Sequence, residues 1–288
     1  MDLMRTIYLN GEYLPENEAQ ISIFDRGFLF SDSVYEVVSV LEGKLADFDR
    51  HVDRLARSMA GLKMLQVPAR DDVLTFCREL VSRNAVNEGV VYMQVTRGNP
   101  GDRNFAAPPA DTVPTICAFT QEMALVDRPE AEDGISVVTL PDKRWGMAHI
   151  KTTQLLYASL MKMEAKALGA DDAWLVRDGF VTEGTSQNTH IVTAEGVLVT
   201  HPLDDQALHG ITQVALKELA ARDGITIEVR VFTVDEAKNA AEAMNTAASA
   251  FVMPVTRIDG IQIGSGKAGP VTRKLRDIYI EFARNTAI

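Results

Sequence analysis

The chain contains 288 residues, of which 46% are hydrophobic and 24% charged, a composition typical of a globular protein with a sizeable core. Forty acidic residues outnumber twenty-nine basic ones and give a formal net charge of -11. Because binding a phosphate backbone requires a basic face, this charge argues against nucleic acid as a partner. The two cysteines, Cys77 and Cys117, lie far apart in apolar runs, so we expect buried thiols rather than a disulfide framework or a zinc site.

The beginning of the chain carries no secretory signal pattern. Asp2 and Arg5 lie among the first residues and no apolar run of the signal type accompanies them, and no stretch of the sequence is long and apolar enough to span a membrane. We therefore expect a soluble, cytoplasmic protein that makes no membrane contact.

Residues 1–124 are predicted to form a small α+β lobe. Asn10-Gly11 favours a two-residue hairpin turn, and Glu42-Gly43 predicts a second hairpin. Asp49 is predicted to cap a helix with Val52, Leu55, Met59 and Leu62 on its apolar face, and residues 73–81 repeat this pattern. The expected strands are 6–9, 12–14, 34–41, 45–48, 89–96 and 112–120. This order predicts a mostly antiparallel sheet.

Residues 125–134 are polar, contain Pro129 and lack periodicity, so they are predicted to link two lobes. Residues 135–288 then form a larger lobe in which strands and helices alternate. A capping box at Thr233-Val-Asp-Glu236 and the pair Gly269-Pro270 each predict the start of a helix. The other expected elements are helices 153–168 and 210–221 and strands 135–140, 173–176, 189–193, 197–200 and 226–232, with a short strand at Val181.

Several general catalytic motifs are absent from the sequence, which contains no GxSxG, P-loop or HExxH pattern. The five histidines do not show the spacing of metal ligands, so we expect structural roles for them and no metal site. These histidines are His51, His149, His190, His201 and His209.

Lys151 lies between a predicted strand and a predicted helix, where a lysine by residue type alone is a surface charge. It belongs, however, to an ordered set of segments whose spacing is specific. The set comprises Phe24-Asp-Arg-Gly27, Asp32-Ser-Val-Tyr35-Glu-Val-Val, His51-Val-Asp-Arg54-Leu, Gln94-Val-Thr-Arg97-Gly, the segment from Arg144 to Lys151-Thr-Thr-Gln, Val181-Thr-Glu183-Gly, Thr200-His-Pro202, Leu208-His-Gly210-Ile-Thr212 and Gly269-Pro-Val-Thr-Arg273.

Over nearly its whole length the chain thereby resembles the fold-type IV enzymes that use pyridoxal 5′-phosphate (PLP). This class holds D-amino acid transaminases, branched-chain transaminases and aminodeoxychorismate lyase, and the Val37-Val38 pair is closest to the D-amino acid branch. The resemblance implies a two-domain α+β fold and PLP as the cofactor. It also implies a homodimer with its active site near the interface.

Lys151 would, by this resemblance, form a Schiff base with the cofactor aldehyde and later carry the proton between the substrate Cα and the cofactor. Glu183 would face the pyridine nitrogen and keep it protonated, so that the ring can accept carbanion electrons. Without the resemblance, Glu183 is a polar turn residue.

The resemblance assigns the cofactor phosphate to Arg54 and to the backbone amides of Ile211 and Thr212, and it places Leu208 against the ring. On residue type alone, Arg54 is a solvated helix residue and the segment after Gly210 is only a helix cap. Relatives also place a phosphate-contacting hydroxyl near Ala248, and its loss here would shift the hold on the phosphate toward Arg54 and the amides.

Substrate recognition is expected from the first lobe. Tyr35 resembles the tyrosine on the substrate side of the cofactor, and Arg103 fits an arginine that holds the substrate α-carboxylate. Phe105 stands where D-amino acid transaminases have a carboxylate-binding histidine, and Ser39 stands where they often have a basic residue. These departures predict weaker carboxylate binding.

The sequence therefore predicts a transaminase that moves the amino group of a D-amino acid, such as D-alanine, to 2-oxoglutarate or pyruvate in a ping-pong cycle. An R-selective amine transaminase is the first alternative, because Phe105 makes the pocket friendlier to apolar amines. A branched-chain transaminase and aminodeoxychorismate lyase follow. A catalytically silent scaffold is the alternative outside enzymes, and the presence of both Lys151 and Glu183 argues against it.

Overall fold

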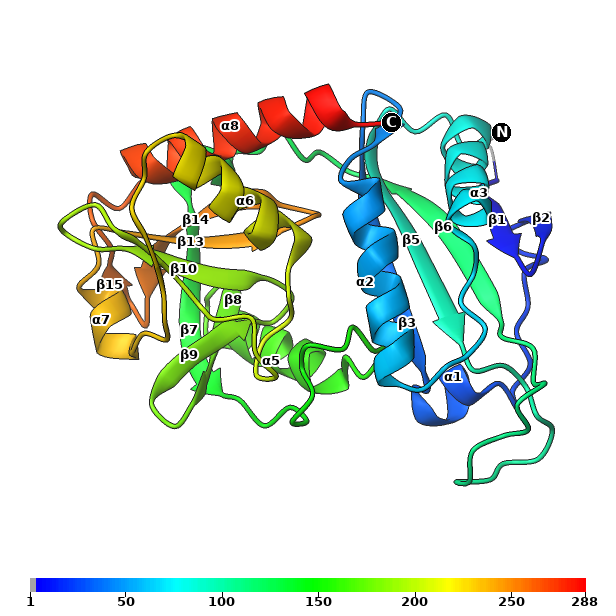
Figure 1. Ribbon diagram of the computed structural model, residues 1–288. Coiled ribbons are helices and arrows are strands. Elements are labelled where there is room, and N and C mark those ends of the chain that lie inside the picture. Colours follow the sequence, from blue (N-terminus) through cyan, green and yellow to red (C-terminus); the bar gives the residue numbers. More distant parts are fainter. Residues whose placement is uncertain (1–3) are drawn as a thin grey trace. The chain divides into compact units, whose positions relative to one another are not determined.

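The computed structural model describes residues 4–288, so Asp2, used above in the argument about a signal, lies outside the described residues. The chain divides into two compact units, whose elements are labelled in Figure 1. The first unit runs up to Ala124 and also includes Ile150–Gln154 and Ala283–Ile288. The second unit comprises Leu125–His149 and Leu155–Phe282. Lys151 therefore belongs to the first unit, and Glu183 belongs to the second.

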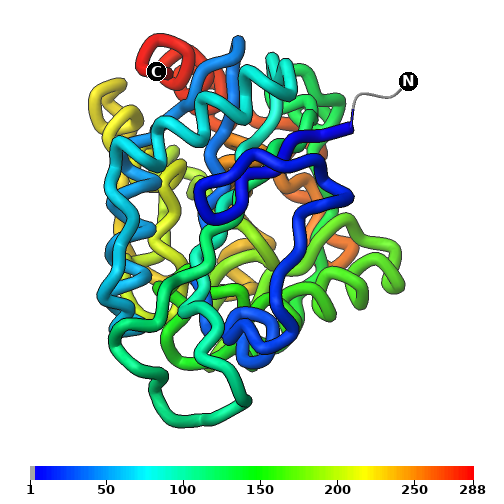
Figure 2. Tube along the Cα trace, turned by 90° about the vertical axis from the view of Figure 1, so that its right-hand side faces the viewer, coloured from blue at the N-terminus to red at the C-terminus, as the bar shows by residue number. Residues whose placement is uncertain are grey.

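The first unit is built on a six-stranded sheet in the order β2-β1-β6-β5-β3-β4. Every neighbouring pair is antiparallel, as the sequence predicts. The strands are β1 (Thr6–Leu9), β2 (Glu12–Pro15), β3 (Ser33–Leu41), β4 (Lys44–Leu45), β5 (Glu88–Thr96) and β6 (Ile116–Glu122). Between β5 and β6 the chain runs out beyond the sheet as a long loop (Figure 2).

The predicted first hairpin is confirmed. Its turn has positive φ at both central residues, 51° at Asn10 and 97° at Gly11, which is the geometry that Asn-Gly favours. The second hairpin is shorter than predicted, because only Lys44–Leu45 pairs with β3 and a helix already begins at Phe48.

The helices of this unit are α1 (Arg26–Phe30), α2 (Phe48–Gly61) and α3 (Arg70–Arg83). Asp49 does not cap α2, so that prediction is wrong: Asp47 holds the cap position, and Asp49 lies in the first turn, where it binds Arg70. Val52, Leu55 and Met59 on α2 are buried as predicted, whereas Leu62 follows the helix and is only half-buried. The sequence did not predict α1, a short helix that begins where Asp25 accepts a hydrogen bond from Gly27 N at 2.7 Å.

The second unit contains a mixed sheet of nine strands, with β15 paired to β14 beside the main order β12-β11-β10-β13-β14-β7-β8-β9. Strand β7 runs parallel to both β8 and β14, and β11 runs parallel to β12. The strands are β7 (Ile135–Pro141), β8 (Asp172–Arg177), β9 (Phe180–Gly184), β10 (Asn188–Val192), β11 (Leu198–Thr200), β12 (Ile227–Val229), β13 (Glu242–Ala247), β14 (Phe251–Ile258) and β15 (Ile261–Gln262).

The helices assigned from Leu125 onward are α4 (Glu130–Asp133), α5 (Leu156–Ala167), α6 (Ile211–Arg222), α7 (Val234–Lys238) and α8 (Pro270–Thr286). The predicted start of α7 is confirmed, because Thr233 Oγ1 accepts a hydrogen bond from Glu236 N at 3.1 Å. Part of the segment predicted as a linker is helical, since α4 lies within it. The core of this unit gathers around the fully buried Trp174, Ile191 and Phe232.

The sequence also led to expectations about membrane spans and about the two cysteines. Among residues 4–288, no helix combines the length and the apolar character needed to cross a membrane. Cys77 is buried and Cys117 half-buried, and neither forms a disulfide.

Candidate functional site

The segment that carries Lys151 lies beside β3 in the first unit. Tyr35 N donates a hydrogen bond to Lys151 O at 3.0 Å, and Lys151 N donates one to Ser58 Oγ at 3.2 Å. Lys151 Nζ lies 4.1 Å from the centroid of the Tyr35 ring. The structure thus brings the predicted catalytic lysine next to the tyrosine predicted for the substrate side.

Tyr35 is held by a row of aromatic rings on the same sheet. Its ring stacks on Tyr92 with centroids 5.6 Å apart, and Tyr92 stacks on Phe119 at 4.8 Å. Burial raises the pKa of Tyr92, and its hydroxyl donates to Gln94 at 2.8 Å. Tyr92 is therefore a neutral support for Tyr35.

Arg54 is buried in α2, with 5% of its surface exposed, so the solvated alternative considered for it is wrong. Its Nε and Nη2 each donate a hydrogen bond of 2.8 Å to the carboxylate of Glu36, which lies on β3. His51 Nδ1 lies 2.7 Å from the same carboxylate. Burial alone would raise the pKa of Glu36, but the charge and hydrogen bonds of Arg54 lower it to about 2. Arg54 is thus held rigidly by an ionised partner.

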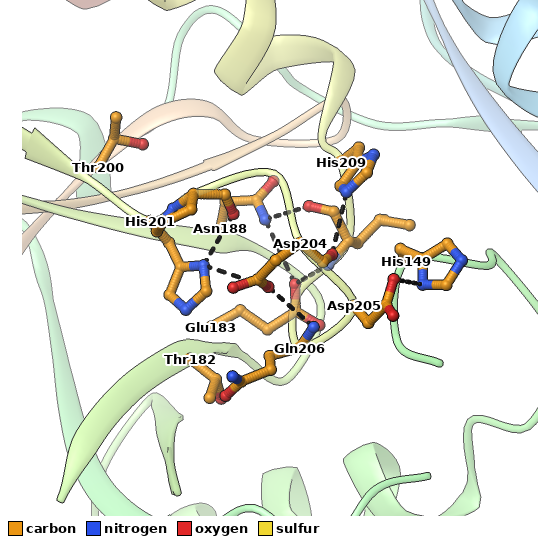
Figure 3. Close-up of polar contacts among 12 residues, drawn as sticks. His149, Thr182, Glu183, Asn188, Thr200, His201, Asp204, Asp205, Gln206 and His209 are labelled. Atoms are coloured by element: carbon orange, nitrogen blue, oxygen red, sulfur yellow. Dashed lines mark hydrogen bonds and ion pairs between the residues drawn. The ribbon is translucent and has the colours of Figure 1, made fainter. Parts of the chain in front are cut away.

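In the second unit, Glu183 lies near the end of β9 with only 7% of its surface exposed (Figure 3). Its Oε2 accepts hydrogen bonds from Leu208 N at 2.9 Å and Asn188 Nδ2 at 3.3 Å, and its Oε1 is bound by Arg144 Nη1. Asn188 Nδ2 also donates to Leu208 O at 2.7 Å. Two of the predicted residues, Glu183 and Leu208, are therefore adjacent. Three donors thus fix the direction of the Glu183 carboxylate.

The start of α6 has the features of an anion site. Gly210 is the N-cap and has no side chain to cap the first turn, in which Ile211 and Thr212 lie. Thr212 Oγ1 is buried and has no hydrogen-bond partner within residues 4–288. A side chain at Gly210 would collide with the amide oxygen of Asn188. The free helix start and the unpartnered hydroxyl fit a phosphate group.

Arg103 and Phe105 lie in the loop between β5 and β6, and Phe105 is 78% exposed. The Arg103 guanidinium lies beside two rings that pack against each other, 4.7 Å from the centroid of Phe105 and 5.0 Å from that of Phe30. Arg26 anchors this loop, because its Nη1 donates to Asn104 O at 2.7 Å and its Nε donates to Asp32 at 2.7 Å. The two predicted substrate residues of this loop are therefore in mutual contact.

The sequence did not identify several charged and polar partners of the predicted residues. Arg144 and Asn188 lie within or directly beside the family segments but carry no predicted role, and neither do Glu36 and Asp142. Glu36 lies between Tyr35 and Val37 in a strand, and Arg144 lies 39 positions before Glu183. Each contact depends on the tertiary fold, so no spacing in the sequence predicts it.

Known proteins resemble this chain over almost its full length. Residues 33–258 match the family described as Amino-transferase class IV. D-alanine aminotransferase of Staphylococcus aureus (strain N315) is 36% identical over 287 residues, which cover 99% of this chain and 100% of the relative. D-alanine aminotransferase of Bacillus licheniformis is 37% identical over 271 residues, 94% of each chain.

Solved structures show the same fold. The branched-chain amino acid aminotransferase of Escherichia coli superimposes with a TM-score of 0.88 at 23% identity, covering 97% of this chain and 95% of its own. A second branched-chain amino acid aminotransferase, from T.th. and solved with pyridoxamine 5′-phosphate, has a TM-score of 0.85 at 26% identity, covering 96% of this chain and 93% of its own. These comparisons confirm the fold class and the cofactor expected from the sequence. The chain belongs to the class IV aminotransferases, which are PLP-dependent transferases of α+β fold.

Proposed function

We propose that this protein transfers the amino group of a D-amino acid, such as D-alanine, to a 2-oxo acid such as 2-oxoglutarate or pyruvate in a ping-pong cycle. The observation that carries the proposal is the 36% identity to a D-alanine aminotransferase over 99% of this chain. The two branched-chain aminotransferase structures described above are less similar to this chain in sequence, with identities of 23% and 26%. This difference supports a D-amino acid over a branched-chain substrate.

Lys151 is the proposed catalytic residue. Bound PLP supplies an electron-accepting ring that stabilises negative charge at the substrate Cα. Lys151 Nζ would bond covalently to the cofactor aldehyde carbon and, once released by the substrate amine, take the proton from the substrate Cα. Tyr35, 4.1 Å away, offers an aromatic face that orients the side chain.

Glu183 would hold the proton on the pyridine nitrogen, and Leu208 would lie against the ring. The three donors on the Glu183 carboxylate support this role, because they fix its direction. The phosphate would be bound by Arg54 and by the amides of Ile211 and Thr212. The unpartnered Thr212 hydroxyl supports an anion at this helix start.

The substrate α-carboxylate would be bound by Arg103, with Tyr35 and Phe105 shaping the pocket. An R-selective amine transaminase is a second candidate, because Phe105 places an exposed aromatic ring where a polar carboxylate partner was expected. The ratio of activity on D-alanine to activity on an arylalkylamine separates the two candidates.

We also propose a cytoplasmic homodimer whose active sites lie near the subunit interface. One face of α5 carries three exposed apolar side chains, those of Leu156, Leu160 and Met163. An exposed apolar face of this kind supports a surface that a partner subunit covers. The domain division proposed is a substrate-side lobe of residues 1–124, a linker of residues 125–134 and a PLP-binding lobe of residues 135–288.

A donor panel tests the substrate proposal. The holoenzyme is given 2-oxoglutarate with either enantiomer of alanine or leucine or with a chiral arylalkylamine, and pyruvate with either enantiomer of glutamate. The products are resolved by chiral chromatography. We expect D-alanine to give pyruvate and glutamate of the D configuration. Preference for L-leucine, or for the amine over every amino acid, would overturn the proposal.

Lys151→Ala tests the catalytic assignment. Borohydride is expected to fix the cofactor to Lys151 in the wild type, as a single modified peptide in mass spectrometry, and to fix none in the variant. Lys162→Ala, which removes a lysine paired with Asp172, is the control and should retain the modified peptide. Labelling of another lysine in Lys151→Ala would refute the assignment.

A further inference from the structure

A cluster of buried charged side chains lies next to Glu183 in the second unit. Asp142 follows directly after β7, and its side chain is completely buried. Its Oδ1 accepts hydrogen bonds of 3.0 Å from both the backbone N and Nε of Arg144. Its Oδ2 accepts bonds of 2.8 Å from Arg144 Nη2 and Thr182 Oγ1, and lies 3.2 Å from Arg177 Nη2. Each oxygen of the Asp142 carboxylate therefore accepts two hydrogen bonds.

Arg144 connects this carboxylate to Glu183. One edge of its guanidinium, Nε and Nη2, faces Asp142, while Nη1 binds Glu183 Oε1. A guanidinium is planar and rigid, so fixing one edge also fixes the direction of the remaining donor. Asp142 thereby determines where Arg144 presents its charge to Glu183.

The cluster is electrically balanced, with two carboxylates and the two cations Arg144 and Arg177. Such buried charges are stable only when each is paired and hydrogen-bonded. Burial alone would raise the pKa of Asp142, but hydrogen bonds from Arg144 lower it to about 2. Asp142 is accordingly a permanent negative charge at neutral pH.

We propose that Asp142 is a positioning residue that acts through Arg144 to aim the Glu183 carboxylate and to set how strongly this carboxylate holds the proton on the cofactor ring nitrogen. The inference rests on the role proposed above for Glu183. Without the charge of Asp142, the positive charge of Arg144 would act undiminished on Glu183. The carboxylate would then attract the proton on the ring nitrogen less strongly, and the ring nitrogen would lose this proton at lower pH.

The charged groups that surround Glu183 in this unit come from three segments. The loop after β7 contributes Asp142 and Arg144, and β8 contributes Arg177. The third segment, residues 201–209, contributes His201, Asp204, Asp205 and His209, and Asp205 is paired with His149 (Figure 3). Arg144 is the one cation that contacts the Glu183 carboxylate within residues 4–288. This makes Arg144 the route by which a distant charge reaches Glu183.

The test measures the ring nitrogen itself. Holoenzyme is prepared with PLP labelled with ¹⁵N in the ring, and the ¹⁵N chemical shift is followed with pH, which reports protonation independently of turnover. In Asp142→Asn we expect the protonation constant of the ring nitrogen to fall on the order of tenfold. Asp142→Ser removes the same charge without placing an amide against Arg144 and should give the same shift, so the result does not depend on one variant folding.

Two further variants separate charge from structure. Asp142→Glu keeps the charge and is expected to retain most of the wild-type protonation. Asp171→Asn, the matched control, removes a carboxylate paired with Lys166 and Ser136 and should leave the ¹⁵N titration unchanged.

Glu183→Gln distinguishes the inference from its premise. If Glu183→Gln deprotonates the ring nitrogen while both neutral Asp142 variants titrate like the wild type, the role of Asp142 is refuted and that of Glu183 stands. If Glu183→Gln also titrates like the wild type, both roles are refuted.

Discussion

The guanidinium of Arg103 lies 4.7 Å from the ring centroid of Phe105. By the resemblance described above, Phe105 is expected at the place of a carboxylate-binding histidine in D-amino acid transaminases. An aromatic ring over a guanidinium covers one of its faces and leaves the N–H groups in its plane available to a carboxylate. We propose that Phe105 holds Arg103 in place and that it supplies no second hydrogen-bond donor to the carboxylate. Phe30, 5.0 Å from the same guanidinium, adds a second aromatic contact.

Arg103→Ala is expected to impair carboxylate substrates selectively. A charge-assisted hydrogen bond contributes about 1.5 to 3 kcal/mol, so kcat/KM for D-alanine should fall on the order of tenfold to a hundredfold, mostly through KM. An arylalkylamine without a carboxylate should lose far less. Steady-state kinetics on both donors measure the difference, with the exposed Arg222→Ala as control. Equal losses on both donors would mean that Arg103 shapes the loop and does not bind the carboxylate.

Phe105→His is expected to act in the opposite direction. The imidazole would add a donor next to Arg103, so KM for D-alanine should fall while the activity on the arylalkylamine stays the same or declines. Phe28→His, on an exposed ring of α1, controls for a histidine placed elsewhere on this surface. An unchanged ratio of the two activities would show that position 105 does not select for the carboxylate.

A third prediction concerns pH and stability. His190 is fully buried, and burial, assisted by the charge of Lys217, lowers its pKa to about 3. It stays neutral in the folded chain, whereas in the unfolded chain it takes up a proton below about pH 6.5. Its contribution to stability is therefore complete above pH 6.5 and declines as the pH falls toward 3, by about 1.4 kcal/mol per pH unit.

His190→Gln should flatten this dependence. Urea unfolding between about pH 7 and pH 5, a range that spans the ordinary histidine pKa, is expected to show a smaller decrease of the free energy of unfolding in the variant than in the wild type. Thr246→Val is the control, because it removes the hydroxyl that His190 Nε2 contacts at 2.9 Å but keeps the imidazole. Parallel curves for wild type and His190→Gln would contradict the prediction.

Elements with local signals were predictable from the sequence. The turn at Asn10-Gly11 needs two residues with positive φ, and Thr233 with Glu236 carries its own capping bond. The strand β13 has no such signal, because its sequence Glu-Ala-Met-Asn-Thr-Ala contains few β-branched residues. It is a strand because β10 pairs with it on one side and β14 on the other. These pairings form only in the folded chain, so the local sequence does not predict them.

The same division holds for the functional residues. The motifs around Lys151 and Glu183 predicted the family, which the comparisons confirm, and the roles proposed for these two residues follow from the chemistry of that family. Asp142 and Arg144 could not be found in this way, because a charged pair two positions apart is ordinary in a loop. Only the fold shows that the pair is buried and that Arg144 reaches Glu183.

The most direct test of the central claim is a single half-reaction. Holoenzyme is mixed with D-alanine or L-alanine in the absence of a 2-oxo acid, and pyruvate is quantified together with the loss of the absorbance of the lysine-bound cofactor. The account predicts one pyruvate per bound cofactor from D-alanine, much slower formation from L-alanine, and none from either with Lys151→Ala. Pyruvate formed from L-alanine as fast as from D-alanine, or formed by Lys151→Ala at the wild-type rate, would contradict it.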